Sequence, residues 1–274
     1  MARQERAVRT REALIRSAAE IFHDEGFHAA ALTTISSRAG VSNGALHFHF
    51  ASKAALADAV EEEAADVLRA VCGRWDGGPP GVLQCLVNAT HELACALQND
   101  VVLRAGFELS REAVRQPRTD LRLCWQNWVT DMVGRAGRGG ELRESVAPES
   151  AVAAVVAATS GFEVLGMRNQ AWLSRSTVAQ FWLLLLPALA PAAARRALAG
   201  RGLLDRDRHR IIKDRTVSFG GADRTPESGI RETAPLFPVR GFPVSRDPRR
   251  WFPVNRSGAG QGTVSRNPGE SWAG

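Results

Sequence analysis

The chain has 274 residues, of which 45% are hydrophobic and 23% charged, so it can bury a core of one large or two modest domains. Its formal net charge is +6. Its four cysteines show no C-x-x-C spacing, and its first twenty residues are charged and amphipathic, which argues against a disulfide scaffold and against a signal segment. We therefore expect a reduced, cytoplasmic protein.

The positive charge is unevenly distributed along the chain. Residues 205–274 carry 13 Lys and Arg against 8 Asp and Glu, whereas residues 1–72 carry 8 against 10. Net charge alone is therefore a weak argument for nucleic-acid binding. The start of the chain is nevertheless a basic arm, comprising Arg3, Arg6, Arg9, Arg11 and Arg16. We expect this arm to neutralise DNA phosphates; the alternative is a solvated end without a partner.

The apolar spacing of the first forty residues predicts two helices. Residues 10–25 place Leu14, Ala18, Ile21 and Phe22 on one stripe, and Gly26 follows as a natural C-terminal cap. A short helix over 35–39 buries Ile35 and Ala39, and Thr33 or Thr34 can cap it.

A sharp turn and a second short helix come next. Gly40 can take the turn, Ser42 can cap the new helix, and Val41, Leu46 and Phe50 face inward. Ser52 then caps a longer helix over residues 53–72. The pattern predicts a four-helix DNA-binding domain over residues 1–72, with a helix-turn-helix motif at about 32–51.

Residues 73–204 predict a second, all-helical domain. Its expected helices are 82–98, 101–115, 119–138, 148–168 and 176–198, separated by Gly- and Pro-rich breaks. The last two are apolar on more than one face, which favours a homodimer interface; the alternative is a thick monomeric core. The apolar run 178–194 is interrupted by Pro187 and Pro191, so we expect no membrane span.

Residues 205–274 are rich in Arg, Pro, Gly and Ser, and Phe-Pro-Val recurs at positions 237, 242 and 252. Frequent proline opposes regular structure, so we expect a disordered tail. The alternative for this tail is a nonspecific contact with DNA or RNA.

No catalytic or cofactor motif is present: the sequence lacks a P-loop, G-x-S-x-G, H-E-x-x-H and a dinucleotide fingerprint. His47 and His49 stand two residues apart on a helix and point in different directions, so we expect no metal there. The protein is therefore expected not to be an enzyme and to need no cofactor.

The N-terminal motif resembles the TetR family of bacterial transcriptional regulators over about residues 8–70. The matching features are Gly26-Phe27, Thr33-Thr34-Ile35, residues 39–42, Gly44-Ala45-Leu46, Phe50 and Ser52-Lys53. The stretch 44–50 is most similar to the γ-butyrolactone autoregulator receptors and their pseudo-receptor relatives, which control antibiotic production. The family usually has Tyr at the position of His47, and His there is common among pseudo-receptors.

The resemblance implies a homodimeric, cytoplasmic repressor that leaves double-stranded operator DNA when a small effector, a lactone or an antibiotic, binds. Ser42, Asn43, His47 and Lys53 would contact phosphates, and Asn43, Ala45 and Leu46 would contact base edges. Further DNA-facing residues would be Thr33, Thr34 and Gly44.

The resemblance also implies an effector-pocket Trp on the helix that carries Trp125 and Trp128, without deciding between them. Leu103, Phe107, Val133 and Phe162 are candidate wall residues; the alternative for all six is plain core packing. Three functional alternatives stay open: a pseudo-receptor insensitive to butyrolactones, a nucleoid-type DNA binder without a ligand, and an enzyme with a helical ligand domain.

Overall fold

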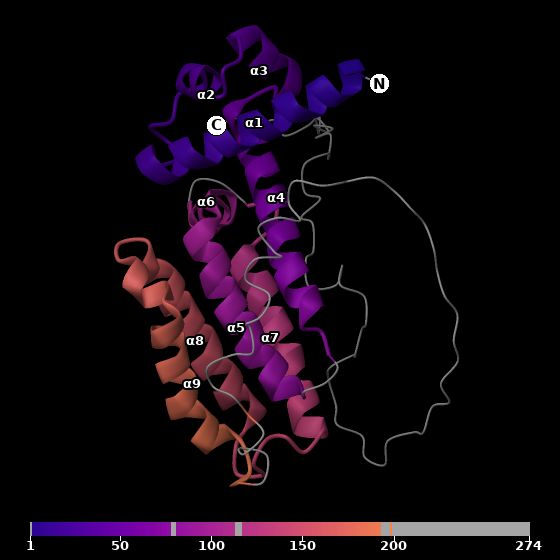
Figure 1. The fold of residues 1–274 in the computed structure, drawn as a ribbon, viewed down its shortest axis with the longest axis vertical. Helices are drawn as coiled ribbons and strands as arrows, with labels where there is room; N and C mark the ends of the chain where they lie inside the picture. Colours follow the sequence, from indigo (N-terminus) through magenta and orange to yellow (C-terminus); the bar gives the residue numbers. More distant parts are fainter. Residues whose placement is uncertain (1, 78–80, 113–116, 193–197, 199–274) are drawn as a thin grey trace, which may run out of the picture.

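The computed structural model describes residues 2–77, 81–112, 117–192 and 198, and within these ranges it is all-helical (Figure 1). The helices are α1 (Ala2–Glu25), α2 (Leu32–Arg38), α3 (Asn43–His49), α4 (Lys53–Arg74), α5 (Val82–Asn99), α6 (Val101–Leu109), α7 (Leu121–Arg138), α8 (Pro148–Gly166), the 3-10 turn η1 (Gln170–Leu173) and α9 (Arg175–Leu189). The tail expected at 205–274 lies outside the described residues.

Helices α1 to α3 form a small head at one end of the molecule, and α4 runs from this head into the bundle below it (Figure 1). Leu14, Ile35, Leu46 and Leu56, one from each of α1 to α4, are all 0% exposed and form the core of the head. The expected four-helix arrangement is confirmed.

Two details of the head differ from the sequence prediction. α1 begins at Ala2 rather than Thr10, so the basic arm is the first part of a continuous helix. α2 begins at Leu32 with Ala31 as its N-cap, and no side chain caps it. Thr33 and Thr34 therefore lie inside the first turn, and the prediction that one of them caps this helix was wrong.

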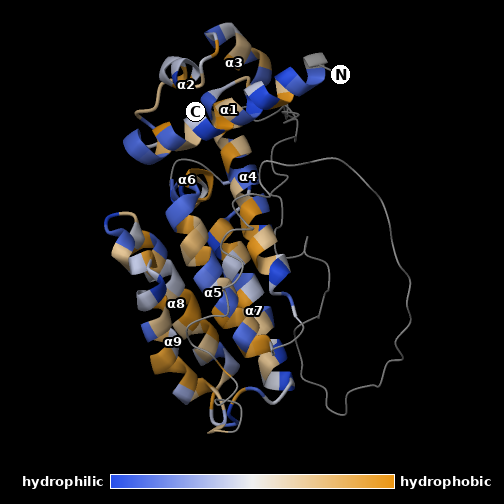
Figure 2. Ribbon diagram, viewed as in Figure 1, coloured by the Kyte–Doolittle hydropathy of each residue, from blue (hydrophilic) through white to orange (hydrophobic). Residues whose placement is uncertain are grey.

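Helices α5 to α9 pack with the lower part of α4 as a bundle whose interior is apolar (Figures 1 and 2). Trp128 and Trp182 are among its largest fully buried side chains. α6 ends at Leu109, earlier than expected, and α9 ends at Leu189. α9 stops there because Ala190 is extended, the conformation favoured by a residue that precedes proline.

α4 and α6 approach one another closely at Gly106. A Cβ atom at this position would collide with the Cβ of Ala64 on α4 and come within 3.0 Å of Leu121. The helix that leaves the head is therefore packed directly against the helix that lies beneath α1.

A distant carboxylate caps the start of α5. Glu141, in the connection between α7 and α8, accepts hydrogen bonds from the amides of Val82 at 2.9 Å and Leu83 at 2.8 Å. Since the N-cap residue Gly81 offers no side chain, Glu141 satisfies amides that the helix itself leaves unpaired.

Candidate functional site

The turn between α2 and α3 is fixed by local hydrogen bonds. Gly40 has a φ of +69°, and its amide donates to the carbonyl of Ser37 at 3.1 Å. The hydroxyl of Ser42 accepts a hydrogen bond from the amide of Ala45 at 3.1 Å, which confirms Ser42 as the cap of α3. Ser52 caps α4 in the same way through the amide of Ala55. These two caps set where α3 begins and where the chain turns away from it.

α3 presents one polar surface to solvent. The exposed residues predicted to contact DNA are Thr33 and Thr34 on α2, and Ser42, Asn43, Gly44 and His47 at or on α3. Ala45 is half-buried. The motif can therefore place amide, hydroxyl and imidazole groups against a nucleic acid without unfolding.

Leu46 and Phe48 change the expected composition of this surface. Leu46 is 0% exposed and packs in the core of the head, so the expectation that its side chain touches a base edge was wrong. Phe48, two residues later, is 83% exposed. The sequence did carry this signal, because the inward positions Leu46 and Phe50 leave residue 48 on the outer face at helical spacing.

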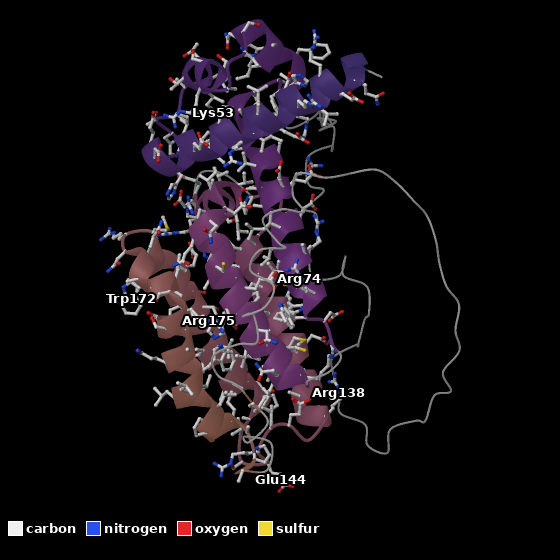
Figure 3. All side chains as sticks on the ribbon, viewed as in Figure 1. Lys53, Arg74, Arg138, Glu144, Trp172 and Arg175 are labelled. Atoms are coloured by element: carbon white, nitrogen blue, oxygen red, sulfur yellow. The ribbon has the colours of Figure 1, made fainter. Side chains whose placement is uncertain are left out.

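Lys53 lies at the first turn of α4, beside α1 in Figure 3. Its ammonium donates to the carbonyls of His28 and Ala30, each at 3.0 Å, and lies 4.9 Å from the ring centre of Phe27. The lysine predicted to contact a phosphate thus also ties the segment between α1 and α2 to the start of α4.

The basic arm runs along α1 toward α3. Arg6, Arg9, Arg11 and Arg16 are exposed, and the guanidinium of Arg11 stacks 5.5 Å from the ring centre of Phe50. This contact joins the arm to the residue that ends α3, so positive charge lies next to the motif.

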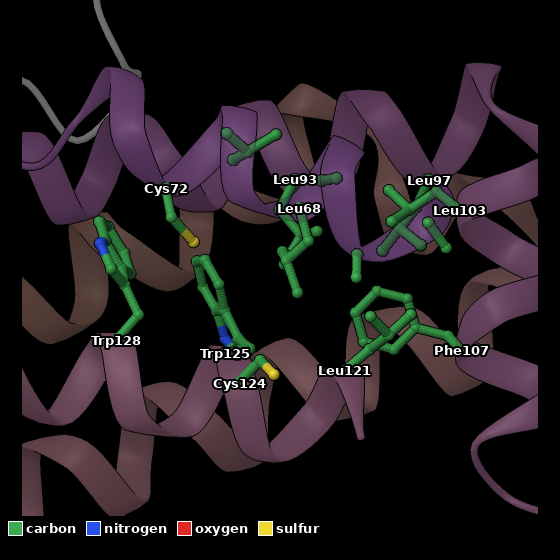
Figure 4. Close-up of a cluster of buried hydrophobic side chains, with 14 of the residues drawn as sticks. Leu68, Cys72, Leu93, Leu97, Leu103, Phe107, Leu121, Cys124, Trp125 and Trp128 are labelled. Atoms are coloured by element: carbon green, nitrogen blue, oxygen red, sulfur yellow. The ribbon is translucent and has the colours of Figure 1, made fainter. Parts of the chain in front are cut away.

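Trp125 and Trp128 lie within the bundle, and their surroundings differ. Their rings are stacked with centroids 5.2 Å apart and planes 26° apart. The indole N–H of Trp125 donates to the hydroxyl of Thr159 at 2.9 Å, while that of Trp128 is buried and has no partner in the described structure. Figure 4 shows Trp125 facing Leu68 and Cys72 of α4.

The other candidate wall residues are buried but spread along the core. Leu103 and Phe107 lie beside Leu121 at the end of the cluster away from the tryptophans (Figure 4). Val133 is 1% exposed, and Phe162 packs edge-on against Phe181 with centroids 5.6 Å apart. The six candidates therefore belong to one apolar core cluster.

Two hollows in the described structure lie elsewhere. One, of about 340 Å³, lies between α1, α2 and the start of α6, and the other, of about 10 Å³, lies beside Arg104 and Glu163. Neither is lined by a candidate effector residue. Glu163 accepts two hydrogen bonds from Arg122, at 2.7 and 2.9 Å, and Arg122 also donates to the carbonyl of Phe107. This part-buried pair joins α7 to α8.

Burial raises the pKa of the thiols nearest the tryptophans, that of Cys124 to about 12. Cys72, also buried, has its pKa raised by desolvation. Both thiols therefore stay protonated at neutral pH and act as small apolar side chains of the core.

Within residues 2–77, 81–112 and 117–192 no three His, Cys, Asp or Glu side chains gather as metal ligands.

One described helix, α8, is long and apolar enough to cross a membrane by length and composition, and 33% of that stretch is buried. Helices in the core or interface of helical bundles have the same character.

A capped turn, an exposed short helix and a basic neighbouring helix define a helix-turn-helix DNA-binding regulator with a helical second domain. Residues 14–60 match the family described as bacterial regulatory proteins, tetR family. Residues 14–60 thus form a TetR-type DNA-binding domain, and the chain as a whole is similar to TetR-family transcriptional regulators.

Several characterised proteins are similar to this chain. The A-factor receptor protein of Streptomyces griseus is 29% identical over 265 residues, 91% of each chain. A solved γ-butyrolactone receptor, described as ArpA-like, is 28% identical and superposes with a TM-score of 0.63 over 72% of this chain and 96% of its own. CprB from Streptomyces coelicolor, solved in complex with its biological operator sequence, is 29% identical with a TM-score of 0.61, over 72% of this chain and 97% of its own.

Proposed function

We propose that this chain is a homodimeric transcriptional repressor that leaves its operator when a γ-butyrolactone-type or antibiotic-like effector binds, and that it acts in the control of secondary metabolism in the cytoplasm. The observation that carries the proposal is the exposed, Ser42-capped α3 in a chain similar to butyrolactone receptors along most of its length. The proposed domains are residues 1–72 for DNA binding and 73–204 for the effector and the dimer.

The proposed DNA interface consists of α3, the exposed residues of α2 and the arm on α1. Ser42, Asn43 and His47 supply hydroxyl, amide and imidazole groups for phosphates, and Asn43 and Ala45 are placed toward base edges. Phe48 adds an apolar contact for a thymine methyl group or a deoxyribose. Gly44 permits close approach because it carries no side chain; a Cβ atom at this position would lie 3.9 Å from the hydroxyl of Ser42.

The outer face of α8, η1 and α9 supports the dimer. Large apolar side chains are exposed along it, comprising Val164, Leu165, Met167, Trp172, Leu183 and Leu184. Trp172 projects from the outer edge of the bundle (Figure 3), and α9 keeps apolar segments along its length (Figure 2). A two-fold pairing of α8 and α9 would cover this face and give two DNA-reading heads, as a two-half-site operator requires.

The proposed effector site centres on the stacked tryptophans. A buried N–H without a partner costs free energy, and a ligand carbonyl can satisfy it. The indole of Trp128 is such a group, and a lactone offers such a carbonyl. Binding would favour the arrangement with lower DNA affinity, since a ligand shifts an equilibrium only by its preference for one state.

Footprinting of the purified protein on the DNA upstream of its own gene, repeated with culture extract and with a synthetic γ-butyrolactone, tests the proposal. Protection that both additions remove supports the receptor function. Protection that only the extract removes identifies a different effector, and protection that neither removes supports a pseudo-receptor, the alternative indicated by His47. Equal binding to all DNA would overturn sequence-specific repression.

A further inference from the structure

Two histidines of the DNA-binding head contact two glutamates of the bundle. Nδ1 of His23 on α1 lies 2.7 Å from a carboxylate oxygen of Glu108 on α6, and Nε2 of His28 lies 3.3 Å from a carboxylate oxygen of Glu112, just beyond the end of α6. Glu108 and Glu112 both reach the head, since α1 packs on α6. These pairs span the boundary between the head and the bundle.

The pair of His23 and Glu108 is half-buried, so solvent screens the attraction between the two side chains only in part. The side chains of His23 and Glu108 are 25% and 16% exposed. The hydrogen bond to Glu108 raises the pKa of His23 above its ordinary value of 6.5, against the opposing effects of desolvation and of Arg104 on α6. Arg16, Glu20 and Asp24 of α1 and Arg38 of α2 line the adjoining hollow with His23.

The second pair leads to the DNA-reading motif. The carbonyl of His28 accepts a hydrogen bond from Lys53, which begins α4 directly after the motif. The side chain of His28 is 63% exposed, so solvent screens its pair with Glu112 more strongly. A chain of contacts thus runs from α6 through Glu112, His28 and Lys53 to the end of the helix-turn-helix.

We propose that the pair of His23 and Glu108 forms a proton-dependent latch between the DNA-binding head and α6, braced by the contact of His28 with Glu112, so that operator binding by this chain responds to pH. The consequence for DNA binding rests on the proposed function, whereas the latch itself does not. α6 lies in the domain proposed to bind the effector, so these four residues position the head relative to that domain.

The sign of the stability effect follows from linkage. Because the folded-state pKa of His23 is raised, its contribution is fully present below the ordinary value and is lost as pH rises through the folded-state value. The neutral imidazole still hydrogen-bonds the carboxylate but no longer carries the opposite charge. The attraction between His23 and Glu108 is therefore stronger in mildly acidic solution than in alkaline solution.

Thermal unfolding of the full chain without DNA tests the latch. Between about pH 6 and about pH 8.5, the difference in Tm between the parent and the double variant Glu108→Gln, Glu112→Gln should narrow by roughly 2–4 °C. Glu25→Gln is the matched control, because Glu25 is exposed on α1 and makes no ion pair among the described residues. A constant difference across this range would overturn the latch.

Operator affinity tests its consequence, with DNA selected by the protein itself as the probe. For each protein, the dissociation constant for this DNA is measured at both ends of the same pH range. The ratio of the two constants should be about five times larger for the parent than for the double variant. His23→Gln should flatten the pH profile in the same way, which separates loss of the latch from misfolding of one variant. Parallel profiles would overturn the coupling, whereas absence of any selected DNA would overturn the proposed function and leave the unfolding result standing.

Discussion

Trp125 and Trp128 stack on one face of α7, yet only Trp125 has a hydrogen-bond partner, the hydroxyl of Thr159. The two indoles therefore differ: one N–H is used within the fold, and the other is buried without a hydrogen-bond partner among the described residues, which is why we propose it as the effector contact. Sequence spacing placed both on the same helix face but could not distinguish them, because the distinction depends on a residue of α8.

Phenylalanine at each position separates the two tryptophans. Trp128→Phe keeps an aromatic ring and should weaken effector-induced release from DNA by about tenfold, since it removes the free donor. Trp125→Phe should lower the free energy of unfolding by about 1 kcal/mol with a smaller effect on release. Release assayed by fluorescence anisotropy and stability measured by urea unfolding decide the assignment. The reverse pattern would make Trp125 the effector residue.

Substitution of Lys53 distinguishes a phosphate contact from the tie to the α1–α2 segment. Lys53→Met keeps a long, flexible side chain and removes the ammonium that lies over Phe27. We expect weaker binding to specific and nonspecific DNA alike, a salt slope lower by about one unit, and a lower Tm because two carbonyls lose their donor. A salt titration monitored by anisotropy, with calorimetry beside it, gives both readouts. An unchanged slope with a lowered Tm would leave Lys53 only its structural contacts.

Phe48 is expected to bind DNA without stabilising the fold. Because its side chain is 83% exposed, Phe48→Ala should leave the Tm nearly unchanged and weaken operator binding by about 1–3 kcal/mol. Its neighbour Leu46 is the contrasting control, since Leu46→Ala should destabilise the head by about 2–5 kcal/mol. Full operator affinity in the Phe48 variant would remove this residue from the interface.

The apolar face of α9 predicts a dimer that one charge can weaken. Leu184 is 82% exposed, so Leu184→Lys should not disturb the protomer core but should raise the dimer dissociation constant by at least about tenfold. Leu123→Lys, on an exposed position of α7, is the matched control and should leave association unchanged. Sedimentation at several protein concentrations measures both. Identical behaviour of the two variants would place the dimer interface elsewhere.

Local chemistry explains which structural features could be predicted. The caps at Ser42 and Ser52 are confirmed because a capping hydroxyl acts on amides two or three residues away. The start of α1 was missed because its first turns are mostly polar and lack an apolar stripe. The contacts of His23 with Glu108 and of Lys53 with two carbonyls join residues far apart in sequence, and no local pattern encodes them.

The cap that Glu141 places on α5 has a consequence for the order of folding. The residues it joins are 58 and 59 positions apart, so the first turn of α5 gains its cap only after α7 has docked and its following connection has closed. The amides of Val82 and Leu83 should therefore exchange with solvent as late as those of the bundle core rather than as fraying helix ends. The start of α5 therefore becomes stable only together with α7 and the connection that follows it. The middle of the chain should accordingly fold as one cooperative unit rather than helix by helix.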